Sequence, residues 1–244
     1  MPTVLGEALS DLLYEGPMEL AKPLGRQRKR STDLEAPPVA QLPIVSVGRP
    51  RAWAIDDLIP QQELPEVIKA SLEAETFFIV RLACSFRPQH DEVRVAWAQL
   101  ALQLKPDQHG LLPLAFDLYP MSVERERKVG KRISLSPQLK FHDVEAGFGE
   151  LAYSVEYPAI EPVLTAAGID ESTPSWNFTA VSGFPLAGAK LLHAVVAAPR
   201  ALSRLTAAVV LTADLDYGRR RFSAWLRGDP ARVHPPVTET QLWP

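Results

Sequence analysis

Two aspartates near the end of the chain, Asp214 and Asp216, come closest in this sequence to a catalytic or metal-binding pair. If they share a strand, both side chains leave the same face about 7 Å apart. Paired carboxylates at such a separation could serve a glycosidase or bind calcium. Outward-facing aspartates near a strand end are also ordinary surface residues. We therefore predict a structural role and keep the catalytic role as an alternative.

The other residue types that perform chemistry are sparse. The five histidines are far apart in sequence, so no two of them form the local pair that metal sites commonly use. The single cysteine, Cys84, lies in an apolar run and is expected to be a buried hydrophobic residue. Ser182 lacks the preceding glycine of a nucleophile elbow. The sequence therefore predicts no catalytic residue, no metal and no cofactor.

Basic side chains gather in two clusters that could contact the phosphates of nucleic acid or of a lipid surface. The clusters consist of Arg26, Arg28, Lys29 and Arg30, and of Arg219, Arg220 and Arg221. The net charge of −3 disfavours a dedicated nucleic-acid-binding protein, which usually has a basic domain. Binding to an anionic surface remains an alternative function.

Residues 3–14 place apolar side chains at helical spacing, which predicts a short amphipathic helix. Its apolar face would offer a partner protein four leucines: Leu5, Leu9, Leu12 and Leu13. Gly16 and Pro17 would end the helix, and the Pro-rich residues 16–50 predict a flexible linker with at most an edge strand over residues 43–47. Such a helix could dock onto another chain or pack on its own domain, and both alternatives stay open.

The elements that must position these residues are β-strands. Residues 132–142 alternate apolar and polar side chains, and only a strand places alternate residues on opposite faces. The same alternation fills residues 76–86, 93–104 and 204–217. The first two of these predict a long β-hairpin, with a bulge near residues 98–100 where the apolar phase changes.

We therefore predict an all-β fold, an antiparallel β-sandwich of roughly eight to ten strands with an N-terminal amphipathic helix and a Pro-rich arm. The arm would span residues 1–50, the sandwich 51–227 and an irregular tail 228–244. The predicted core consists of Phe78, Leu82, Trp97, Leu102, Ile133, Phe141, Tyr153, Trp176, Val195 and Val209.

The resulting functional prediction is a non-enzymatic protein-interaction or assembly module, either binding a partner protein or forming a homo-oligomer whose N-terminal arms exchange between subunits. A small-ligand or metal-binding protein, or an enzyme with a site built from loops, is the alternative, and the residues to test would be Asp214, Asp216, His193 and Trp176. Neither a signal peptide nor a long apolar stretch is evident, so we expect a cytoplasmic protein.

Overall fold

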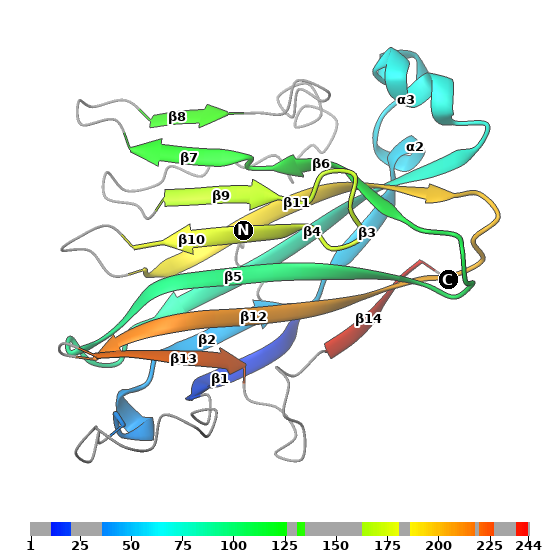
Figure 1. The fold of residues 1–244 in the computed structure, drawn as a ribbon. Coiled ribbons are helices and arrows are strands. Elements are labelled where there is room, and N and C mark those ends of the chain that lie inside the picture. The colour runs from blue at the N-terminus through cyan, green and yellow to red at the C-terminus, as the bar shows by residue number, and fades with distance from the viewer. Residues whose placement is uncertain are drawn as a thin grey trace.

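The computed structural model describes residues 11–20, 36–125, 131–134, 163–180, 186–217, 220–226 and 238–243. Strands dominate this part of the chain, and every strand pair in it is antiparallel. Figure 1 shows the strands arranged in two sheets, one behind the other. The prediction of an antiparallel all-β fold is confirmed.

The first sheet has the strand order β6-β11-β4-β2-β1, and β3 also pairs with β4. Its strands are β1 (Leu12–Leu20), β2 (Ile44–Gly48), β3 (Arg51–Ala54), β4 (Glu75–Arg87), β6 (Leu114–Tyr119) and β11 (Gly188–Pro199). Two short helices, α2 (Ile55–Leu58) and α3 (Glu66–Ser71), connect β3 to β4, and the 3-10 turns η1 (Val39–Gln41) and η2 (Gln61–Glu63) precede β2 and α3.

The second sheet has the order β8-β7-β9-β10-β5-β12-β13, and β14 also pairs with β12. Its strands are β5 (Val93–Pro106), β7 (Ser122–Arg125), β8 (Lys131–Ser134), β9 (Val163–Ala167), β10 (Ser175–Thr179), β12 (Leu205–Tyr217), β13 (Arg220–Leu226) and β14 (Thr238–Trp243). The described residues thus form fourteen strands, more than the sequence led us to expect.

Strand β1 belongs to both sheets. Its residues 12–17 pair with β2 in the first sheet, and its residues 18–20 pair with β13 in the second. Figure 1 shows β1 (dark blue) at the lower side of the molecule, next to β13 and β2. Met18, at the point where the pairing changes, is only 1% exposed and belongs to the core. This one strand therefore joins the two sheets along one side of the molecule.

The main core fills the space between the sheets. Alternate residues of β4, β5, β11 and β12 point into it, as a strand requires, and Trp176 of β10 lies fully buried among them. A second, smaller core lies on the outer face of the first sheet, where α2 and α3 cover it. That second cluster consists of Ile55, Ile59, Leu64, Ile68, Leu72, Phe77, Ile79, Val195 and Ala197.

Several predictions about individual elements are wrong. β4 and β5 lie in different sheets and are not a hairpin, because β4 pairs with β2, β3 and β11 whereas β5 pairs with β10 and β12. The bulge in β5 falls at residue 96, between the positions that pair with Asp214 and Leu215. Trp97 therefore points outward, away from the main core to which the sequence assigned it. Val195 is buried, but in the smaller cluster.

The N-terminal region also differs from the prediction. Residues 12–14 begin strand β1 and do not end a helix, and Gly16 and Pro17 lie inside that strand. The expected edge strand over residues 43–47 is found as β2, but it has neighbours on both sides. The C-terminal tail includes strand β14. Residues 3–10, Phe141 and Tyr153 lie outside the described residues.

Candidate functional site

The four residues of the predicted loop-built site do not converge. Asp214 and Asp216 lie on the outer face of β12 in the second sheet, because the residues between and beside them, Ala213 and Leu215, belong to the main core. His193 lies on the outer face of β11 in the first sheet. Trp176 is 0% exposed inside the core. The two outer faces are separated by the thickness of both sheets, so no shared site forms.

A row of polar side chains crosses the outer face of the first sheet. Arg51, Arg81, His193 and Tyr119 are successive cross-strand partners on β3, β4, β11 and β6. Directly opposite residues share a face of the sheet, so all four lie on the side that α2 and α3 also cover. The Arg81 guanidinium stacks over the Trp53 ring at 5.1 Å, a cation–π contact, and is nearly buried.

The His193 ring is held in its neutral form by this setting. Its Nδ1 atom is inaccessible to solvent, although part of the residue's surface is exposed. Burial and then the charge of Arg81 lower the pKa of His193 from 6.5 to about 4. The Tyr119 ring lies beside it with the centroids 6.3 Å apart. His193, half-buried between an arginine and a tyrosine, therefore carries no charge at neutral pH.

This setting predicts how the protein responds to acid. His193 is protonated near pH 6.5 in the unfolded chain, but only near pH 4 in the folded protein. Its contribution to the free energy of unfolding is therefore fully present above pH 6.5 and is lost as the pH falls from 6.5 towards 4. We expect about 2 kcal/mol of this loss to disappear in His193→Gln. Urea unfolding of both proteins at pH 7 and pH 4.5 measures it, and equal losses in the two proteins would contradict the prediction.

The outer face of the second sheet carries two further rows of side chains. The amide row consists of Thr165, Asn177, Gln99 and Thr212, on β9, β10, β5 and β12. The tryptophan row consists of Thr179, Trp97 and Asp214, on β10, β5 and β12. Thr165 and Thr179 are exposed, and the other five are half-buried.

The bulge at residue 96 creates the tryptophan row. Before the bulge Val95 points into the core, and after it Ala98 and Leu100 do, so Trp97 is turned outward between Thr179 and Asp214. β-bulges commonly re-aim a side chain in this way. In the amide row, Gln99 Nε2 donates a hydrogen bond of 3.1 Å to Asn177 Oδ1. The Gln99 Nε2 atom also lies 3.5 Å from Ser175 Oγ.

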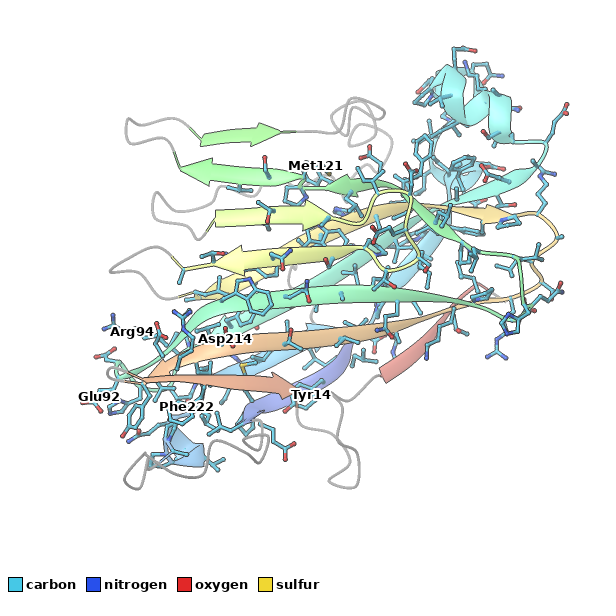
Figure 2. The ribbon with its side chains drawn as sticks, viewed as in Figure 1. Tyr14, Glu92, Arg94, Met121, Asp214 and Phe222 are labelled. Atoms are coloured by element: carbon cyan, nitrogen blue, oxygen red, sulfur yellow. The ribbon has the colours of Figure 1, made fainter. Side chains whose placement is uncertain are left out.

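Charged residues border these rows where β5 begins and β12 ends. Arg221 Nε lies 3.1 Å from Asp216 Oδ1, and Arg94 is the other cross-strand partner of Asp216. The hydrogen bond to Asp216 raises the pKa of Arg221, and the charges of Asp216 and Asp214 add to the effect. Figure 2 shows Asp214 and Arg94 at this same end of the sheet. Opposite charges are therefore mixed at this border.

The predicted contact residues are only partly described. Leu12 and Leu13 belong to β1, where Leu12 is opposite Gly48 and Leu13 packs against the main core. They do not form the apolar face of a separate helix. Arg220 and Arg221 belong to β13. The remaining predicted contact residues lie outside the described part of the chain: Leu5, Leu9, Arg26, Arg28, Lys29, Arg30 and Arg219.

Two further features limit the chemistry of the described residues. Cys84 is buried as predicted, and burial raises the pKa of its thiol to about 12 even though Lys190 is its cross-strand partner. It is therefore not a thiolate at neutral pH. Among the residues with described positions, no three histidine, cysteine or acidic side chains gather closely enough to hold a metal ion.

Sequence reasoning missed Trp97, Gln99 and Asn177 as surface groups. Gln99 and Asn177 do alternate with apolar neighbours, which is a signal for outward side chains. Trp97 gave the opposite signal, because it continues the alternation of the inward residues Val93 and Val95. Only a bulge at residue 96, two residues before the predicted region 98–100, turns Trp97 outward.

Comparison with known proteins identifies no family. No protein-family model matches the sequence, and no curated protein matches it. Within the described residues, no helix has the length and apolar character needed to span a membrane.

Solved structures give only remote likenesses. The Clostridium perfringens NetB toxin in its membrane-inserted form aligns at 7% identity and a TM-score of 0.32, covering 69% of this chain and 83% of the toxin chain. A pore forming protein aligns at 5% identity and a TM-score of 0.34, covering 81% and 90% of the two chains. The Clostridium perfringens delta-toxin aligns at 8% identity and a TM-score of 0.28, covering 82% and 83%. At such low scores these likenesses carry no conclusion about function.

Proposed function

We propose that this protein is a non-enzymatic assembly module whose copies join by exchanging the N-terminal strand β1. The observation that carries the proposal is the position of β1 between β2 and β13, where it completes both sheets. If β1 left its own chain, the edges of β2 and β13 would both be open. An open edge is a template for a strand from another chain.

The contacts that hold β1 favour exchange. Its backbone pairs with β2 and β13, and only Met18 of β1 is fully buried, while Leu13, Tyr14 and Leu20 pack partly buried against the main core. Two exposed ion pairs add to these contacts: Glu15 of β1 pairs with Arg87, and Asp11, just before β1, pairs with Arg49 at 3.3 Å. Exposed ion pairs contribute little to stability. The β1 strand of a second copy can make every one of these contacts identically, so exchange loses none of them.

The connection to β2 is long enough for β1 to reach a neighbouring copy. Residues 21–38 separate β1 from the 3-10 turn at Val39–Gln41 that precedes β2. A chain of that length spans up to about 60 Å when fully extended. Exchange of an identical element between protomers is a low-cost route to a dimer, because the contacts that hold the element are already optimised within one chain.

Disulfide trapping tests the exchange directly. Glu15 and Ser46 are cross-strand partners on β1 and β2, with Ser46 Oγ 3.4 Å from Glu15 Oε1. Directly opposite residues of an antiparallel pair lie within the Cα separation that a disulfide needs. Glu15→Cys and Ser46→Cys chains are made separately, unfolded, mixed, refolded and oxidised. We expect a disulfide-linked dimer containing one chain of each variant, and the buried Cys84 does not compete.

Two controls complete the experiment. The double variant Glu15→Cys/Ser46→Cys reports whether the disulfide geometry is suitable, because it forms either within one chain or across a closed pair. Light scattering of the full chain and of a chain lacking residues 1–20 gives the oligomeric state. A double variant that closes within a monomer, together with no mixed dimer from the single variants, would refute the proposal.

A further inference from the structure

The part of the second sheet's outer face that the amide row and the tryptophan row form is unusual for a sheet surface. The amide row and the tryptophan row contain threonine, asparagine, glutamine, tryptophan and aspartate, and neither row holds a lysine or a glutamate. Natural proteins usually keep exposed sheets soluble with long charged side chains. Short polar side chains on adjacent strands have few rotamers, so they hold their functional groups in fixed positions.

The amide row offers donors and acceptors side by side. The 3.1 Å bond from Gln99 to Asn177 uses one amide hydrogen of Gln99 and the carbonyl oxygen of Asn177. The Asn177 amino group and the Gln99 carbonyl oxygen can still bond to a ligand. The Thr212 hydroxyl, on the next strand, can both donate and accept. Neighbouring strands are about 4.8 Å apart, which sets the spacing of these groups.

The tryptophan row adds an apolar surface and a strong acceptor. Trp97 is half-buried between Thr179 and Asp214, and its indole ring supplies a rigid apolar area. Asp214 lies directly opposite Trp97 on β12, and its carboxylate accepts hydrogen bonds only. Thr179 lies opposite Trp97 on the other side, on β10, and is exposed. An apolar ring is thus placed between two groups that bind hydroxyls.

A ligand that matches both rows must present an apolar face together with several hydroxyl groups. A sugar ring has both, because its C–H groups form one face and its hydroxyls project from the rim. We infer that the amide row and the tryptophan row bind neutral sugar units of an oligosaccharide. The four neighbouring strands β9, β10, β5 and β12 together span roughly 14 Å across the sheet, which is wider than one sugar ring.

Other ligand classes fit this face less well. A phosphate group would meet the carboxylate of Asp214 at the β12 end of the tryptophan row, and like charges repel. A peptide that adds a strand needs a sheet edge, whereas β5 and β10 have neighbours on both sides. The ion pair of Arg221 with Asp216 leaves the border of the patch close to neutral. Neutral hydroxyl groups therefore suit the patch better than charged groups do.

The test measures binding of three defined probes, maltohexaose, cellohexaose and chitohexaose, to the full-length protein by calorimetry and by tryptophan fluorescence. We expect millimolar to micromolar binding of at least one probe, little changed by 0.5 M NaCl because no net charge is involved. Trp97→Ala and Asn177→Ala are each expected to weaken that binding by roughly tenfold or more.

The chain supplies a matched control in Gln103, which lies on the same face of β5 as Gln99 but opposite Ala208, beyond the two rows. Gln99→Ala should weaken binding, while Gln103→Ala should not, and circular dichroism checks that all variants are folded. Failure of all three probes to bind, or equal binding by the Gln99 and Gln103 variants, overturns the inference. Strand exchange through β1 is measured separately by the mixed disulfide. The outcome of the sugar-binding test therefore does not depend on the outcome of the exchange test.

Discussion

Trp176→Ala is expected to lower the free energy of unfolding by about 3–5 kcal/mol. Trp176 is 0% exposed and lies in the main core between the sheets, so its removal loses buried apolar area and leaves a cavity that neighbouring strands cannot close. Its indole nitrogen makes no hydrogen bond within the described residues, so the loss is one of packing alone. Urea denaturation measured by circular dichroism gives the change.

The same substitution at Trp97 is the matched control. Trp97 is half-buried on the outer face of the second sheet, so Trp97→Ala should cost no more than about 1 kcal/mol. The pair also tests the position of the bulge in β5. If residues 97 and 176 were both inward, as the sequence pattern alone indicates, the two substitutions would cost similar amounts of stability.

Met18→Lys is expected to destabilise the protein by about 3 kcal/mol or more. Met18 is 1% exposed where β1 passes from the first sheet to the second, and its backbone N–H donates to the Pro43 carbonyl at 3.1 Å. A lysine at this position must either bury an ammonium group or pull β1 out of the space between β2 and β13. The second response would uncover both strand edges.

Chemical denaturation and protease digestion distinguish these two responses. Release of β1 predicts new cleavage near the N-terminus at urea concentrations that leave the rest of the protein folded, because local opening precedes global unfolding. The control, Glu15→Lys, replaces an exposed residue of the same strand and removes its ion pair with Arg87 and its hydrogen bond from Ser46 Oγ. A Met18 variant as stable as the Glu15 variant would show that β1 is not needed to join the sheets.

The strands that the sequence identifies best are the long alternating ones. β4, β5 and β12 fall close to their expected positions, because a strand with one face in a core repeats with a period of two residues. The sequence does not show which of these strands pair with one another. Adjacent alternating segments usually form hairpins, but here β4 and β5 separate into different sheets, and no local signal distinguishes these outcomes.

The first strand shows why local patterns fail at the N-terminus. Val4 to Leu13 has the spacing of an amphipathic helix, yet the part that is described, from Leu12, is a strand. Gly16 and Pro17 are poor strand formers, but the N–H that Pro17 lacks is one hydrogen bond among many that β2 and β13 provide. Distant strands thus override local propensity here, and sequence spacing contains no information about them.

The candidate site was still harder to predict. The amide row and the tryptophan row bring together residues of β5, β9, β10 and β12, which lie far apart in the chain. Register decides which side chains become neighbours, and a single bulge changes it. The pairs Asn177 with Gln99 and Trp97 with Asp214 depend on both, so they follow only from the folded structure.

The smaller core on the outside of the first sheet bears on how this chain folds. Phe77 and Ile79 of β4 bury their side chains against α2 and α3, which come just before β4 in sequence, whereas β11 comes about a hundred residues later. During synthesis, β4 therefore emerges after α2 and α3, which cover its outer face, and after its neighbours β2 and β3, while its other partner β11 is still missing. We expect the α2–α3 segment to shield the apolar outer face of β4 and so to reduce aggregation of the nascent chain until β11 has been synthesised.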